Sequence, residues 1–134
     1  MRKRWVLRRR DLETSCAYRR EFSSLLARSV IRDTTTDGLH ELVFGELVTN
    51  AVRHGDEPMC VCVEFDDASM KIVVENAGGC AALEKVVAGP NAEGGRGLLI
   101  VRALVSKLDI EHSPEVPCRI TATMPVATAT ATAQ

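Results

Sequence analysis

The stretch that decides how the chain folds is Glu46-Leu47-Val48-Thr49-Asn50-Ala51-Val52-Arg53-His54-Gly55. Apolar residues recur through it and before it at helical spacing, which predicts a helix that Asp37 caps and that runs to His54. Gly55 follows where a left-handed residue commonly ends a helix. The predicted buried stripe of this helix is formed by Leu39, Leu42, Val43, Leu47 and Ala51.

Three polar residues of this helix, Glu46, Asn50 and His54, are spaced i, i+4 and i+8, so they project from one side in successive turns. Glu46 could accept a proton as a general base. Asn50 could offer its carbonyl oxygen to a hard cation such as Mg²⁺. On spacing alone, an ordinary polar face explains these residues better than a site does, since surface helices carry such faces routinely.

A second motif, Glu93-Gly94-Gly95-Arg96-Gly97-Leu98, precedes an apolar helix that we predict from Leu98 to Lys107. Glycines let backbone N–H groups approach a phosphate, and the start of the helix adds positive partial charge. Arg96 could add a charged contact. Glycines before a helix also occur as plain connectors, so this signal is weak alone. The chain has no GxxxxGK[ST] run and no GxGxxG after a strand, which argues against a P-loop and a Rossmann site.

The third motif, Glu75-Asn76-Ala77-Gly78-Gly79, ends a predicted strand. A polar side chain at a strand end, followed by glycines, can read the amino edge of a flat heterocycle while the chain turns around it. A glycine-rich turn capped by Asn76 explains the same residues equally well.

The rest of the pattern predicts one α+β domain. A first helix runs from Thr14 or Ser15 to about Val30, and alternating apolar residues predict strands after the second helix. The order β-α-α-β-β-loop-α-β-β implies a two-layer sandwich, a mainly antiparallel sheet with helices on one face. Its 134 residues fit one domain, which we place at 1–126, followed by a low-complexity tail at 127–134 that we expect to fray. The predicted strands are Trp5–Leu7, in a basic edge segment 2–10, and Met59–Asp66, Met70–Asn76, Leu108–His112 and Cys118–Met124.

Charge is distributed unevenly along the chain. The first ten residues hold six basic side chains and no acid, and the remainder carries 11 basic against 18 acidic side chains, a balance of −7. An acidic body would repel phosphate, so we interpret the arm as a solvated edge and do not predict direct nucleic-acid binding.

The sequence favours a cytoplasmic location. No apolar run reaches the length of a membrane span, and the basic start lacks the apolar segment of a signal peptide. The five cysteines show no CxxC spacing, so reduced structural thiols are favoured over a metal site or a disulfide framework.

Taken in order, the three motifs resemble those of the GHKL (Bergerat-fold) ATP-binding superfamily. The N-box would be Glu46–Gly55, the G1 box would lie around Asn76–Gly78, and the G2 box would be Gly95–Leu98. The resemblance covers roughly residues 12–125 and is strongest to the bacterial anti-sigma-factor serine/threonine kinases, which are single small domains.

The resemblance implies that the cofactors are ATP and Mg²⁺. Glu46 would be the general base and Asn50 the Mg²⁺ ligand, while Asn76 would face the adenine amino group and Gly78 would let the base approach. Residues 80–96 would form the ATP lid. The remaining candidates would lie around the phosphates, namely Arg53, His54, Gly95, Arg96, Gly97 and Leu98.

By the same resemblance, the protein would bind a sigma factor and phosphorylate a serine or threonine of a STAS-domain antagonist. A homodimer is also implied, and the Trp5–Arg9 edge and the first helix offer surfaces for it. The family normally presents Asp to adenine, whereas this chain has Asn76, which loses a charge-assisted hydrogen bond and roughly 1 kcal/mol or more of binding energy.

Two other functions stay open. A protein-interaction module that binds ATP weakly or not at all, and acts by sequestering a partner, fits the change at Asn76. The catalytic domain of a histidine kinase would need a preceding helical hairpin with a phosphoacceptor histidine, which the 134 residues do not include, so we expect that role only of a fragment.

Overall fold

The computed structural model describes residues 2–8, 15–31, 38–66, 68–78, 96–115 and 117–128. In these ranges the helices are α1 (Ser15–Ser29), α2 (Leu39–His54) and α4 (Arg96–Leu104). The strands are β1 (Arg2–Leu7), β2 (Val30–Ile31), β3 (Met59–Phe65), β4 (Ser69–Asn76), β5 (Lys107–Glu111), β6 (Cys118–Pro125) and β7 (Ala127–Thr128).

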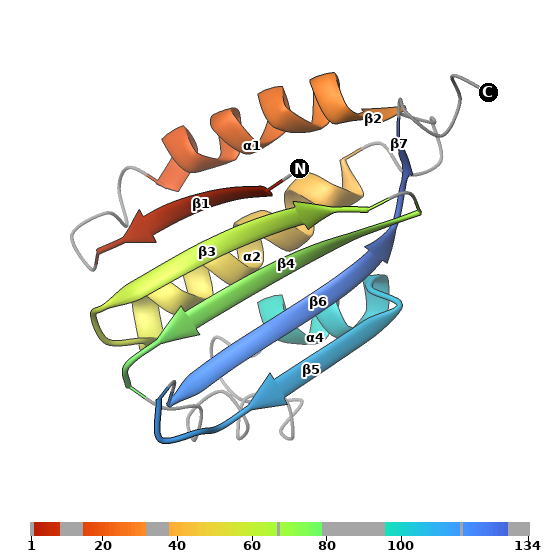
Figure 1. Cartoon of the computed structure of the whole chain (residues 1–134). Coiled ribbons are helices and arrows are strands. Elements are labelled where there is room, and N and C mark those ends of the chain that lie inside the picture. The colour runs from red at the N-terminus through yellow and green to blue at the C-terminus, as the bar shows by residue number, and fades with distance from the viewer. Residues whose placement is uncertain are drawn as a thin grey trace.

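The main sheet has the strand order β1-β3-β4-β6-β5, and each neighbouring pair is antiparallel. The helices lie on one face of this sheet. Helix α2 lies behind the central strands, and α4 packs beside α2 (Figure 1). The predicted α+β sandwich of a mainly antiparallel sheet with helices on one face is therefore confirmed. The sequence also predicts a short helical stretch from Ala81 to Ala88, which lies outside the described residues.

The core lies between the sheet and α2. Phe44 of α2 is fully buried, stacks on Phe22 of α1 with a centroid distance of 4.2 Å, and meets the ring of Trp5 edge-on at 5.3 Å. The Trp5 indole N–H donates to the carboxylate of Glu21 on α1, which satisfies its one polar atom. Leu42, predicted for the buried stripe, is 41% exposed, so that prediction is wrong.

The start of α2 also differs from the prediction. Its N-cap is Gly38, with φ of 86°, and no side chain caps it; Asp37 lies outside the described residues. The Gly38 carbonyl accepts the first intrahelical hydrogen bond from the Leu42 N–H at 3.0 Å. The left-handed backbone at Gly38 explains why glycine, rather than a side chain that caps, stands there.

The β3–β4 hairpin turns through Asp66. Its carboxylate accepts hydrogen bonds from the N–H groups of Ala68 and Ser69, at 3.0 and 2.7 Å, and from the Ser69 hydroxyl at 2.8 Å. These hydrogen bonds lower the pKa of the exposed Asp66 carboxyl below its ordinary value. The bond from the Ala68 N–H has the largest effect, and the bonds from Ser69 come next. The carboxylate of Asp66 therefore holds the start of the connection between β3 and β4.

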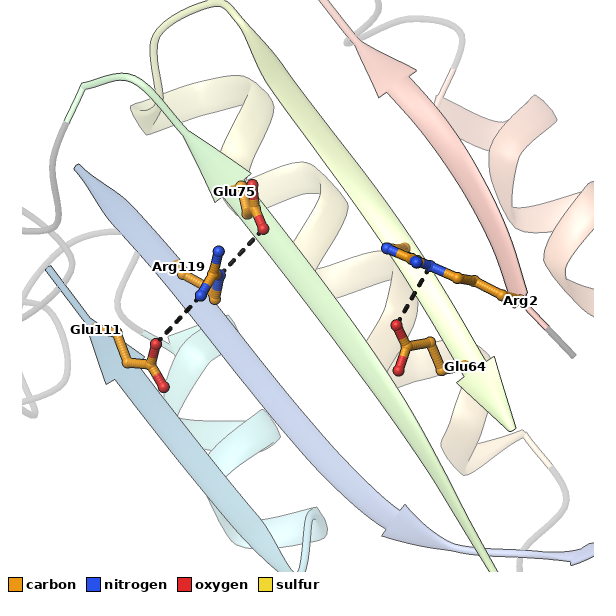
Figure 2. A network of polar contacts seen from close by, with 6 residues as sticks. Arg2, Glu64, Glu75, Glu111 and Arg119 are labelled. Carbon is orange, nitrogen blue, oxygen red and sulfur yellow. Dashed lines mark hydrogen bonds and ion pairs between the residues drawn. The ribbon is translucent and has the colours of Figure 1, made fainter. Parts of the chain in front are cut away.

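The helix-free face of the sheet carries ion pairs that cross its strands. Arg119 on β6 contacts Glu75 on β4 at 3.0 Å and Glu111 on β5 at 3.5 Å, while Arg2 contacts Glu64 at 3.3 Å (Figure 2). Such partly exposed pairs each contribute about 0–1 kcal/mol, so they align strands more than they stabilise the fold.

The cysteines differ from one another. Cys60 and Cys62 are buried free thiols, and the Arg2 guanidinium donates to Cys62 Sγ at 3.1 Å. Cys118 is disulfide-bonded. The prediction that all cysteines are reduced thiols is therefore wrong for Cys118, because spacing along the chain cannot reveal which residues the fold brings together.

The second sheet is a two-stranded pair that the pattern did not predict. In β2 and β7, Val30 pairs with Thr128 and Ile31 with Ala127. The first two residues of the segment expected to fray thus form a strand. Across the described ranges, no helix is long and apolar enough to cross a membrane.

Candidate functional site

Helix α2 carries the first pair of predicted site residues. Asn50 is 8% exposed, and Glu46, one turn earlier, is half-buried. Arg53 and His54 lie exposed in the last turn, where basic side chains interact favourably with the carbonyl end of a helix. An ordinary polar face on a surface helix rarely contains a nearly buried carboxamide, because such helices expose most of their polar side chains. The burial of Asn50 therefore argues against that simpler explanation.

Gly55 ends α2 in extended backbone, with φ of −88° and ψ of 173°, so the predicted left-handed conformation is wrong. Space explains the glycine instead. A Cβ atom on Gly55 would lie 2.7 Å from the Ala51 carbonyl oxygen and 3.0 Å from Asn76 Cγ. Gly55, the last residue of the Glu46–Gly55 motif, therefore packs directly against the side chain of Asn76.

Asn76 ends β4, the central strand of the sheet, and is 4% exposed. Its Oδ1 accepts a hydrogen bond from the Gly78 N–H at 2.7 Å, and the Ala77 N–H donates to the Asp56 carbonyl at 3.0 Å. A Cβ atom on Gly78 would lie 2.8 Å from Asp56 Oδ2. A backbone hydrogen bond thus holds the segment after α2 against the turn after β4.

Asp56 was not predicted from the sequence. Its carbonyl and its carboxylate both lie against the 77–78 turn, next to the candidate base-binding residue. The only available signal was its place directly after the Glu46–Gly55 motif, and no spacing rule connects that place with Gly78.

The third motif is described in part. Helix α4 begins at Arg96, and Leu98 in its first turn is 1% exposed, so its side chain belongs to the core and only its backbone could meet a ligand. Gly95 and most of the predicted lid lie outside the described residues. Helix α4 contacts α2, and its first turn points toward the end of the sheet where β4 ends (Figure 1).

The arrangement suits a nucleotide with its metal. Asn50, one turn before the end of α2, and Asn76, at the end of β4, are both nearly buried carboxamides. Neither Gly55 beside Asn76 nor Gly78 beside Asp56 has room for a Cβ atom. In the described part of the chain, no group of three or more His, Cys, Asp or Glu forms a complete metal site. Mg²⁺ needs none, because it commonly takes one or two protein oxygens together with substrate phosphates and water.

Comparison with protein families matches residues 9–123 to the histidine kinase-like ATPase domain. A comparison with curated proteins gave no match. The fold and the site define an α+β domain of the GHKL ATPase type, which implies ATP binding. The chain belongs to the histidine kinase-like ATPase domain family.

Replacing Gly55 by alanine tests the junction between the two motifs. The added methyl would meet the Ala51 carbonyl and Asn76, so we expect about 1–3 kcal/mol of destabilisation and weaker ATP binding. The control is Gly45→Ala. The atoms nearest to its added methyl would be those of the Arg19 guanidinium, at 2.5–2.8 Å, and this flexible side chain can move aside. Denaturant unfolding of both variants checks this, and equal effects would show that Gly55 has no special role.

Proposed function

We propose that this protein is an anti-sigma-factor-type regulatory kinase that binds ATP with Mg²⁺ and phosphorylates a serine or threonine of a STAS-domain antagonist while sequestering a sigma factor. We further propose a cytoplasmic homodimer. The observation that carries the proposal is the junction of Gly55 and Asp56 with Asn76 and Gly78. This junction connects the Glu46–Gly55 motif, which would hold the metal, with the Asn76–Gly78 motif, which would hold the adenine ring.

Each residue has a separate task in this proposal. The half-buried Glu46 takes the proton of the attacking hydroxyl, and Asn50 offers its amide oxygen to the metal one turn further on. Bound Mg²⁺ would neutralise charge on the phosphates. Phosphoryl transfer depends mainly on positioning and charge neutralisation, so few protein groups are needed.

Labelled phosphate tests the kinase. The protein is incubated with γ-labelled ATP, Mg²⁺ and a purified STAS-domain protein from the same genome, and label in that protein is expected on serine or threonine. The companion sigma factor is tested for binding by co-elution. Absence of label from every STAS-domain protein of the genome, with ATP bound, would contradict the kinase and leave the nucleotide site standing.

Asn50→Ala is expected to remove the contribution of Mg²⁺ to nucleotide affinity, because the variant loses the amide oxygen that would face the metal. We expect ATP affinity in Mg²⁺ to fall about tenfold, a change of roughly 1.4 kcal/mol. Affinity in EDTA should not change, which makes the EDTA titration the internal control. An equal loss in both buffers would show that Asn50 acts on the fold or the nucleotide and not on the metal.

A second candidate is a protein-interaction module that sequesters its partner without turnover. Asn76 favours it, because an amide at the base position lacks the charge of a carboxylate. Binding of the sigma factor that is equally tight with and without ATP, together with no detectable phosphate transfer, would support this candidate over the kinase.

A further inference from the structure

A pocket lies at one end of the helix-free face of the sheet, where β1 and β4 end and β3 begins. Along β1, Trp5 and Leu7 are buried in the core. Because the side chains of a strand alternate between its two faces, Arg4 and Val6 point to the helix-free side, and both line the pocket. The sheet therefore separates this pocket from α2, which carries Asn50 on the other side (Figure 1).

The pocket has the size and the lining of a small-molecule site. Its volume is about 320 Å³, within the range of roughly 300–1,000 Å³ that is usual for such sites. Most residues around it are apolar, among them Val6, Pro58, Cys60 and Pro117. Val6 is 56% exposed, more than any other large apolar residue in the part of the chain that the structure describes. A ligand that covers Val6 would remove this apolar surface from water, which favours binding.

Charged side chains of both signs line the same pocket. Glu75 already has a partner, because its Oε1 accepts a hydrogen bond from the Arg119 guanidinium at 3.0 Å. Arg4 and Glu115 differ, since neither forms a side-chain hydrogen bond or an ion pair within the described ranges. Their charged groups also lie more than 4.0 Å from each other. The pocket thus combines one unpaired cation and one unpaired anion with apolar side chains.

We propose that this pocket binds a free amino acid with a large apolar side chain. The ligand carboxylate pairs with the Arg4 guanidinium, its ammonium pairs with the Glu115 carboxylate, and its side chain covers Val6. An amino acid fits because it carries both charges next to an apolar group. A simple apolar acid would leave Glu115 unpaired and bring a second negative charge toward it, and a simple amine would do the corresponding harm at Arg4.

The test compares three ligands that differ only in their charges. Labelled protein is titrated with L-phenylalanine, with hydrocinnamate, which lacks the ammonium, and with phenethylamine, which lacks the carboxylate, and binding is followed by NMR. We expect L-phenylalanine to bind with a dissociation constant of about 1 mM and shift the resonances of Val6 and Ala77. Each analogue should bind about fivefold more weakly, as is typical of the loss of one exposed ion pair.

Two variants assign the charges to their residues. Arg4→Gln should remove the preference for L-phenylalanine over phenethylamine, and Glu115→Gln should remove the preference over hydrocinnamate. Both side chains are exposed, so neither change should unfold the protein. Arg2→Gln is the matched control, because Arg2 lies on the same strand and face but is already paired with Glu64. It should leave all three affinities unchanged.

Several results would overturn the inference. The first is the absence of any change in the spectrum up to roughly 20 mM L-phenylalanine. The second is equal affinity of the unmodified protein for all three compounds. The third is a loss in Arg2→Gln as large as that in Arg4→Gln, and the fourth is a set of shifts that does not include Val6 and Ala77.

Discussion

Under the proposed kinase function, Glu46→Ala is expected to lower phosphate transfer to a STAS-domain antagonist by about 10²–10⁴-fold, the usual contribution of a general base. Glu46 is half-buried one turn before Asn50, so a hydroxyl that approaches the metal-bound phosphate would also approach its carboxylate. Since the residue would act on the attacking hydroxyl, ATP affinity should change by less than about threefold. The measurement is initial rates of label incorporation at saturating ATP.

The control for this variant is Glu41→Gln. Glu41 is a half-buried carboxylate in the first turn of α2, far along the helix from Asn50, so its replacement should leave the transfer rate nearly unchanged. Full transfer by Glu46→Ala would show that another group accepts the proton. Equal losses in Glu46→Ala and Glu41→Gln would point to the stability of α2 rather than to catalysis.

Phe44→Ala is expected to cost about 3–5 kcal/mol of stability, a large share of the roughly 5–15 kcal/mol that holds a typical domain together. Phe44 is fully buried between the rings of Phe22 and Trp5, so truncation leaves a cavity that three elements line. Trp5 is the only tryptophan, which makes its fluorescence a direct reporter of this cluster during urea unfolding.

Leu42→Ala is the matched control for Phe44→Ala. It shortens a large apolar residue of the same helix, but Leu42 is 41% exposed, so we expect a loss of about 1 kcal/mol or less. A loss below about 1.5 kcal/mol for Phe44→Ala would contradict the assignment of this cluster as the centre of the core.

The contrast between Leu42 and Phe44 shows how far periodicity alone predicts burial. From the pattern we predicted one narrow buried stripe on α2, but α2 contacts α1 and α4 as well as β4. It therefore buries a wide arc that includes Val43, Phe44, Leu47 and Val48. A sequence window predicts that a helix forms, whereas the number of neighbours that surround it depends on the whole fold.

Long-range contacts explain the other differences. Glycine at 55 was expected for a left-handed turn, but its position against Asn76 depends on a strand end more than twenty residues later. The two-residue strands β2 and β7 are too short to show a period and form only by pairing with each other. By contrast, the main strands and helices were predictable because each repeats its apolar pattern over several residues.

The candidate site was predictable as a set of motifs but not as a geometry. The resemblance of the three motifs to the GHKL superfamily identified Glu46, Asn50, Asn76 and Gly78, and the family comparison supports that superfamily. The contact between the ends of α2 and β4, and the position of Asp56 beside Gly78, are seen only in the structure. No local pattern reports such contacts, because they arise when α2 packs against the sheet.

The most direct test of the nucleotide site is calorimetric titration of the unmodified protein with ATP, in Mg²⁺ and in EDTA. We predict binding with a dissociation constant in the micromolar range in Mg²⁺, a binding free energy of about −5 to −8 kcal/mol, and clearly weaker binding in EDTA. Absence of binding at millimolar ATP in Mg²⁺ would contradict the assignment of Asn50 and Asn76 to a nucleotide site.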